Sequence, residues 1–172
     1  MNGKWVAGGI VGASLIFGAA LYYSQVYAYY ERLDASAPAS EVTAATVVGT
    51  SEDLLATDFT GIDAETSPIR FRACFTTPLS LAMITETFEP YDDATPLVAP
   101  NWFSCFDADQ IGMDIENGNA ISILGEANIH YGIDRVIAVY PDGRGFAWNQ
   151  INPCGEAVFD GDPAPAGCPP AP

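Results

Sequence analysis

Residues 133–152 read IDRVIAVYPDGRGFAWNQIN, and this stretch decides the fold. Two runs rich in apolar residues flank Pro141, Asp142 and Gly143, and that tripeptide favours a tight turn. We therefore predict a β-hairpin that turns at these three residues. The short apolar stretch AISILG, at residues 120–125, predicts a third strand beside the hairpin.

Two upstream stretches also have the composition of strands. EVTAATVV, at residues 41–48, is rich in β-branched residues, and SPIRFRACFTTP, at residues 67–78, alternates apolar residues with others. Because side chains alternate across a strand, Arg70 and Arg72 are expected together on the face opposite the apolar residues.

Two stretches between the strands predict helices. Residues 79–88 follow Pro78, and residues 107–117 have Asp107 as an N-cap and Gly118 as a stop signal. Strands around short helices, without regular strand-helix alternation, indicate an α+β domain. We expect a mainly antiparallel sheet with two or three short helices.

The N-terminal segment predicts a single transmembrane helix. Residues 5–23, WVAGGIVGASLIFGAALYY, carry no charge, and a helix of this length spans about 28 Å, close to the hydrocarbon thickness of a bilayer. A cleaved signal peptide is the alternative. It normally has a shorter apolar region, and Gly18 to Ala20 offer only a weak cleavage site.

The residues that flank this segment predict its orientation. Lys4 and the amino terminus precede the span, whereas Arg32 follows it among acidic residues. The cationic flank favours the cytoplasmic side, so the N-terminus is expected in the cytoplasm and the C-terminal part on the exported side of the membrane. Five tyrosines at the far end predict an aromatic belt in the headgroup layer: Tyr22, Tyr23, Tyr27, Tyr29 and Tyr30.

Small residues recur four positions apart within the span. Gly8 and Gly12 form one such pair, and Ser14 and Gly18 form another. Small side chains let two membrane helices approach closely. These residues are therefore the predicted packing face for another helix, either a second copy or a different protein.

The charge of the exported part restricts its partners. The chain has 6 Lys and Arg against 22 Asp and Glu, a formal net charge of -16. From Asp34 onward there are four cations against 21 acids. This excess excludes the basic surface that nucleic-acid binding requires. It can attract a basic protein partner, such as a small electron carrier, or serve only to keep the domain soluble.

Changes in composition divide the chain into four segments. Residues 1–33 are the predicted anchor helix, and residues 34–40, DASAPAS, are a stalk. Residues 41–159 form the exported α+β domain, and the Pro-rich residues 160–172 form a surface tail.

Four cysteines in an exported domain predict two disulfides, with three possible pairings. We expect Cys74 to pair with Cys105, joining a strand to a loop. Cys154 and Cys168 bracket a Pro- and Gly-rich segment and are expected to tether the tail. A zinc site is the alternative, but the sequence has no Cys-x-x-Cys and a single histidine.

No catalytic, cofactor-binding or metal-binding residue is predicted. His130 is the only histidine and has no Gly-x-Ser-x-Gly motif to accompany it, so a structural or surface role is expected. Residues 107–118 partly resemble a calcium loop, but Ile111 and Gly118 stand where ligands are required. The candidate partner surface is instead aromatic: Trp102 and Phe103 follow Pro100 in a predicted loop.

Several stretches resemble a bacterial family of membrane-anchored proteins known as a domain of unknown function. They are SPIRFRACFTTPLSLAMITETFEPYDDATPL, APNWFSCFDADQIG, DRVIAVYPDGRGFAWNQINPCGE and the start MNGKWVAGGIVGASLIFGAALYYSQVYAYYE. The resemblance implies a single-helix anchor and an exported domain in a Gram-negative cell envelope. It implies no activity or cofactor.

These observations favour a non-enzymatic accessory or assembly subunit of an inner-membrane complex, such as a respiratory or electron-transfer complex. The alternatives are a periplasmic sensor or ligand-binding module and, third, an envelope enzyme. A roomy pocket beside His130, or beside Arg70 and Arg72, would favour these alternatives.

Overall fold

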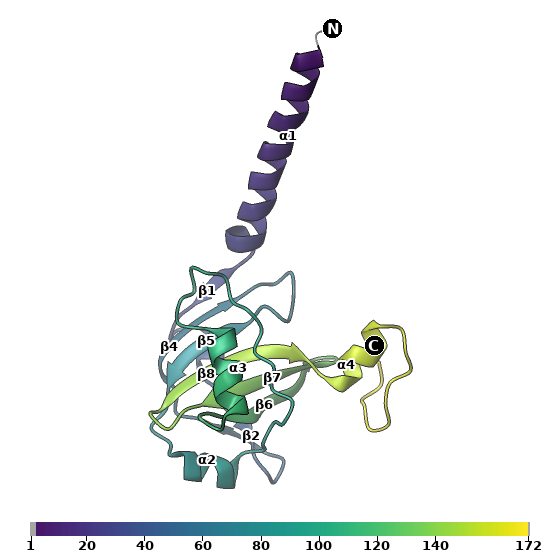
Figure 1. Ribbon diagram of the computed structural model, residues 1–172. Helices are drawn as coiled ribbons and strands as arrows, with labels where there is room; N and C mark the ends of the chain where they lie inside the picture. Colours follow the sequence, from purple (N-terminus) through teal and green to yellow (C-terminus); the bar gives the residue numbers. More distant parts are fainter. Residues whose placement is uncertain (1–2, 172) are drawn as a thin grey trace. The chain divides into compact units, whose positions relative to one another are not determined.

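The computed structural model describes residues 3–171. The chain consists of two units that divide between Tyr30 and Glu31, and each unit is described by itself (Figure 1).

The first unit is helical. α1 (Gly3–Tyr23) continues into a π-helical turn (Ser24–Ala28), where the Ser24 hydroxyl donates to the Ala20 carbonyl at 2.9 Å. Residues Gly3–Ala28 form the one helix, within the described part of the chain, that is long and apolar enough to cross a membrane. The ring of Tyr27 stacks on Tyr23 and meets Tyr22 edge-on.

The helix stops earlier than the predicted boundary at residue 33. β1 (Glu31–Leu33) belongs to the second unit and pairs with β4 (Thr57–Asp63), with Arg32 opposite Ile62. The predicted stalk is also partly structured. It contains a short 3₁₀ helix (Pro38–Ser40), and Ala39 packs against the core.

The second unit is built on a six-stranded antiparallel sheet in the order β1-β4-β5-β8-β7-β6 (Figure 1). The remaining strands of this sheet are β5 (Arg72–Thr76), β6 (Ile121–His130), β7 (Ile133–Val139) and β8 (Arg144–Ile151). A separate pair, β2 (Thr43–Ala45) and β3 (Ser51–Asp53), forms a small second sheet.

The predicted hairpin and its neighbouring strand are confirmed. β7 and β8 pair from Ile133 and Ile151 up to Val139 and Gly145, and the Gly143 amide donates to the Tyr140 carbonyl across the turn. Gly143 has a φ of +86°, a conformation in which glycine avoids the strain of a side chain. The sequence predicted only the first residues of β6, and it did not predict β3 or β4.

Three α-helices complete the domain. α2 (Leu81–Thr87) and α3 (Ala108–Glu116) lie within the predicted helical ranges, and the Asp107 carboxylate caps α3 by accepting from the Gln110 amide. The third helix, α4 (Pro153–Phe159), was not predicted. Figure 1 shows it beyond the far end of β7 and β8.

Apolar residues cover both faces of the sheet. On one face Phe71, Ala73 and Phe75, in and just before β5, pack into a core with buried residues in or next to the small sheet and α2: Val42, Ala44, Ile84 and Phe88. On the other face the ring of Phe106, just before α3, packs edge-on against Phe146 and Trp148 of β8. The sheet therefore lies between two apolar layers.

Arg72 lies on the face of β5 opposite Phe71, as the alternation predicts, but it does not face solvent. Its side chain is buried, and its guanidinium donates to the carbonyls of Leu97 at 2.6 Å and Ile69 at 2.8 Å. This cation thus holds the loop after α2 against the sheet.

Candidate functional site

The predicted helix-packing residues all lie in α1. A Cβ atom added at Gly8, Gly12 or Gly18 would meet no other atom within 4 Å. At about 100° per residue, Gly8 and Gly12 lie on one side of the helix, and Ser14 and Gly18 lie about a third of a turn away. The four residues therefore form two separate strips rather than a single packing face.

Both predicted disulfides are confirmed. Cys74 of β5 is bonded to Cys105, and Cys154 of α4 is bonded to Cys168 in the tail. The first bridge joins the centre of the sheet to the segment that carries Phe106. The second closes the tail onto a short helix.

The candidate aromatic surface is wrong for one of its two residues. Phe103 is buried, so its ring cannot contact a partner. Trp102 is half-buried, and the guanidinium of Arg32 lies 4.8 Å from the centroid of its ring. The indole ring therefore helps to fasten β1 to the loop.

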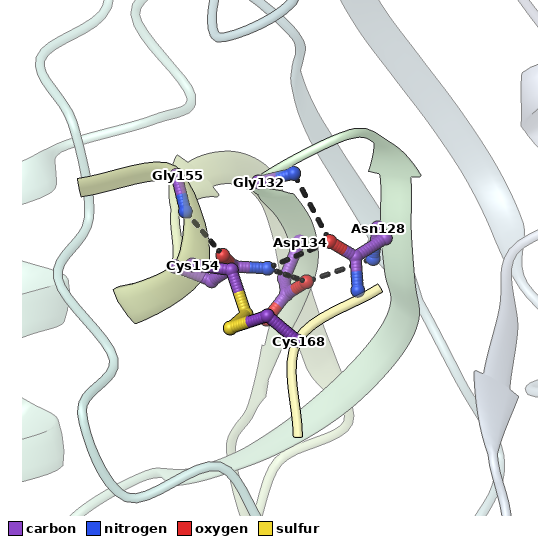
Figure 2. Close-up of a disulfide and its surroundings, with 7 residues drawn as sticks. Asn128, Gly132, Asp134, Cys154, Gly155 and Cys168 are labelled. Carbon is purple, nitrogen blue, oxygen red and sulfur yellow. Dashed lines mark hydrogen bonds between the residues drawn. A yellow bond between two sulfur atoms is a disulfide. The ribbon is translucent and has the colours of Figure 1, made fainter. Parts of the chain in front are cut away.

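A buried carboxylate, which the sequence analysis did not single out, organises the end of the sheet near α4. Asp134 of β7 accepts hydrogen bonds from the Asn128 amide at 2.8 Å, the Asn152 side chain at 2.7 Å and the Tyr91 hydroxyl at 3.1 Å. We call Asp134, Asn128, Asn152 and Tyr91 the Asp134 network. Figure 2 shows Asp134 beside Asn128, close to the disulfide of α4.

The same network positions α4. The Asn152 side chain caps the helix by accepting from the Gly155 amide, and Asn128 accepts from the Gly132 amide (Figure 2). Gly132 and Gly155 pack backbone against backbone so closely that a Cβ atom on either one would overlap the other. The tail disulfide is thus attached to a tightly fixed helix.

A cleft with a volume of about 670 Å³ lies beside this network. It is bounded by residues 90–97, the end of β8, the start of α4, and Ile69. We call it the acidic cleft, because four carboxylates line it and its lining contains no Lys, Arg or His: Asp92, Asp93, Asp134 and Glu156. Burial, Asp134 and Asp93 raise the pKa of Tyr91, which also lines the cleft and therefore stays protonated at neutral pH.

A second cleft, of about 480 Å³, lies beside His130, which is exposed at the end of β6. Arg135 lines this histidine cleft, and its guanidinium lies 3.8 Å from the ring centroid of Phe71 and donates to Asn149. Burial lowers the pKa of Arg135, while Asp63 and Glu126 act to raise it. The cleft thus combines a cation with nearby acids.

No group of three or more His, Cys, Asp or Glu within residues 3–171 is arranged to hold a metal ion. The calcium-like stretch that begins at Asp107 forms the capped helix α3 instead. The carboxylates of the acidic cleft are likewise too dispersed to share one small ion.

The chain therefore combines an apolar helix with an acidic α+β domain that has two disulfides and open clefts. A model described as a family of unknown function (DUF6446) matches residues 42–169, and the chain belongs to this family. No curated protein and no solved structure matches the chain.

Sequence reasoning missed the acidic cleft because its residues come from four separate stretches of the chain. Local signals did exist: Asn152 precedes Pro153, which is a typical start of a helix, and Asp92 and Asp93 are adjacent acids in a Pro-bounded loop. Neither signal indicates that these stretches meet in space.

Proposed function

We propose that this protein is a non-enzymatic accessory or assembly subunit of a bacterial inner-membrane complex, which presents an acidic periplasmic domain to a protein partner. The observation that carries the proposal is one membrane-length helix joined to a folded unit with a net charge of -17, from five cations and 22 acids. A respiratory or electron-transfer complex, which can be visited by a basic carrier, fits such a surface.

The positions of two of the cations leave most of the acidic surface charge uncompensated. Arg72 is buried against backbone carbonyls, and Arg144 forms a salt bridge with Asp142 at 2.7 Å. Most acids, in contrast, are exposed. Uncompensated surface charge of one sign steers partners of the opposite sign toward the surface, and added salt weakens this steering.

The first experiment is mild detergent extraction of the full chain, followed by native electrophoresis and mass spectrometry. Migration with a membrane complex in a fixed ratio supports the proposal, and migration alone or as a simple dimer contradicts it. The double variant Gly8→Leu/Gly12→Leu is expected to release the protein from the complex. Ala13→Leu/Ala20→Leu, about 100° around the helix, is the matched control and should keep it bound.

A periplasmic sensor or ligand-binding module is the second candidate, and the histidine cleft beside His130 and Arg135 favours it. A guanidinium stacked on an aromatic ring can bind a small carboxylate ligand through charge-assisted hydrogen bonds. Saturable binding of acetate or succinate that is lost in Arg135→Gln but kept in Arg144→Gln would favour this candidate over the accessory subunit.

A further inference from the structure

The acidic cleft has the size of a binding site. Its volume of about 670 Å³ lies within the range of ligand pockets, which runs from roughly 300 to 1,000 Å³. Apolar side chains contribute to its walls, among them Ile69, Leu97 and Ile151. Low-dielectric walls around charges of one sign concentrate the electric field inside a cleft.

Partly buried hydrogen bonds hold the wall that carries Asp92 and Asp93. The buried side chain of Gln150 accepts from the Thr95 amide at 2.8 Å and donates to the Asp93 carbonyl at 2.9 Å. On the other side, the Tyr91 amide and carbonyl both bond to Ser122. A wall fixed in this way loses little conformational entropy when a partner binds.

The opposite wall is fixed too. Glu156 lies in the first turn of α4, whose cap, Asn152, belongs to the Asp134 network. Asp92, Asp93 and Glu156 are exposed, and their side chains make no hydrogen bond within the described residues. They are therefore available to an incoming cation.

The chemistry of the lining selects the occupant. The dispersed carboxylates do not suit a single metal ion, and the apolar walls do not suit a fully hydrated one. A Lys or Arg side chain has an apolar stem and a cationic end, so it can satisfy both parts of the lining. The volume also exceeds what one such side chain fills, which favours a short segment of polypeptide.

We propose that the acidic cleft receives a basic segment of a partner protein, with Arg or Lys side chains directed to Asp92, Asp93 and Glu156 and apolar neighbours against Ile69, Leu97 and Ile151. This inference rests on the proposed function, because it names the contact through which the domain engages its protein partner.

The test titrates the full-length protein in detergent micelles with the peptide (Arg-Leu)₃ and measures binding by calorimetry. The cleft variant Asp92→Asn/Asp93→Asn/Glu156→Gln is expected to weaken binding at least tenfold. Glu52→Gln/Glu86→Gln/Glu116→Gln removes the same charge from exposed acids outside the cleft and should weaken it no more than twofold. Unchanged near-ultraviolet circular dichroism establishes that each variant is folded.

Equal weakening in both variants would overturn the proposal, because binding would then depend only on the net charge. Binding of (Gln-Leu)₃ as tight as that of (Arg-Leu)₃ would also overturn it, as would tight spermidine binding without peptide binding. If the cleft variant still migrates with its membrane complex, the cleft assignment fails while the proposed function stands. If the wild-type protein migrates without a membrane complex, the proposed function fails, whatever the peptide titration shows.

Discussion

The centre of the sheet and its end near α4 are held by different interactions. At the centre, Phe106 packs on Phe146 and Trp148, and the Cys74–Cys105 bridge closes the same layer. At the α4 end, the Asp134 network fixes the helix, and the Cys154–Cys168 bridge holds a tail that is largely exposed. Apolar burial dominates the centre and directed hydrogen bonds dominate the α4 end.

The difference bears on function because the acidic cleft lies at the end held by hydrogen bonds. Buried hydrogen bonds fix geometry more specifically than apolar contacts do, but they fail sharply when one partner is removed. The cleft is therefore expected to be rigid in the intact protein and sensitive to single substitutions around Asp134.

The largest effect is expected from Asp134→Ala. This change removes the acceptor of three hydrogen bonds, from Asn128, Asn152 and Tyr91, and we expect a loss of about 4 kcal/mol in the free energy of unfolding. Urea denaturation measures it. Asp92→Ala, in an exposed position of the same cleft, is the control and should stay within about 0.5 kcal/mol of the wild type.

A stability loss for Asp134→Ala as small as that for Asp92→Ala would contradict the role given to the network. Hydrogen bonds would then not be what holds the α4 end of the sheet.

Next in size are the disulfides, which allow the centre of the sheet and its α4 end to be compared directly. The loop-entropy relation gives about 3.7 kcal/mol for Cys74→Ser/Cys105→Ser and about 3 kcal/mol for Cys154→Ser/Cys168→Ser. The first pair should lower the stability of the whole domain. The second should mainly increase hydrogen exchange in α4 and the tail. Equal exchange across the sheet in the two variants would contradict this division.

Gly132→Ala tests the close packing of Gly132 on Gly155. Gly132 has a φ of +73°, and an added Cβ would also overlap the backbone of Gly155, so we expect a loss of about 3 kcal/mol. Gly118→Ala is a matched control. It has a φ of +72° with open space around it, and strain alone should cost about 1 kcal/mol. Equal melting temperatures for the two variants would show that the packing contributes nothing.

The smallest effect is a pH dependence at Asp114 of α3. Hydrogen bonds from Gln110, Tyr140 and Asn119 lower the pKa of Asp114 in the folded protein. Its charged form therefore stabilises the fold above the ordinary pKa of 3.8, and that contribution is lost as pH falls through the lowered value.

We expect Asp114→Asn to be slightly less stable than the wild type at pH 7, with a difference that disappears toward pH 2. Urea denaturation at both pH values measures this. A difference that persists unchanged at low pH would contradict the assignment.

Much of the fold followed from local patterns. The β7–β8 hairpin and the Asp107 cap of α3 depend on residues that are neighbours in the sequence. The two disulfides followed from four cysteines in an exported domain without a Cys-x-x-Cys motif. β4 was missed because its strand contains Asp58, Gly61 and Asp63, residues that are uncommon in strands, and long-range pairing with β1 and β5 overrides that preference.

The sites were less predictable for the same physical reason. Arg72 and Asp134 are charged residues that periodicity alone would assign to solvent, yet backbone carbonyls and donors from distant segments make their burial favourable. Phe103 shows the opposite error. A ring in a Pro-bounded loop suggested an exposed patch, but the loop folds back over the sheet and buries it.

The most direct test of the central claim is site-specific photocrosslinking of the full chain in its native membrane. A photoreactive residue replaces Thr95, which is exposed in the acidic cleft, or Ser51, which is exposed on β3 outside it. The account predicts one major adduct from position 95, mapped to a segment of a membrane-complex protein that contains Lys or Arg, and none from position 51. No adduct from position 95, or the same adducts from both positions, would contradict it.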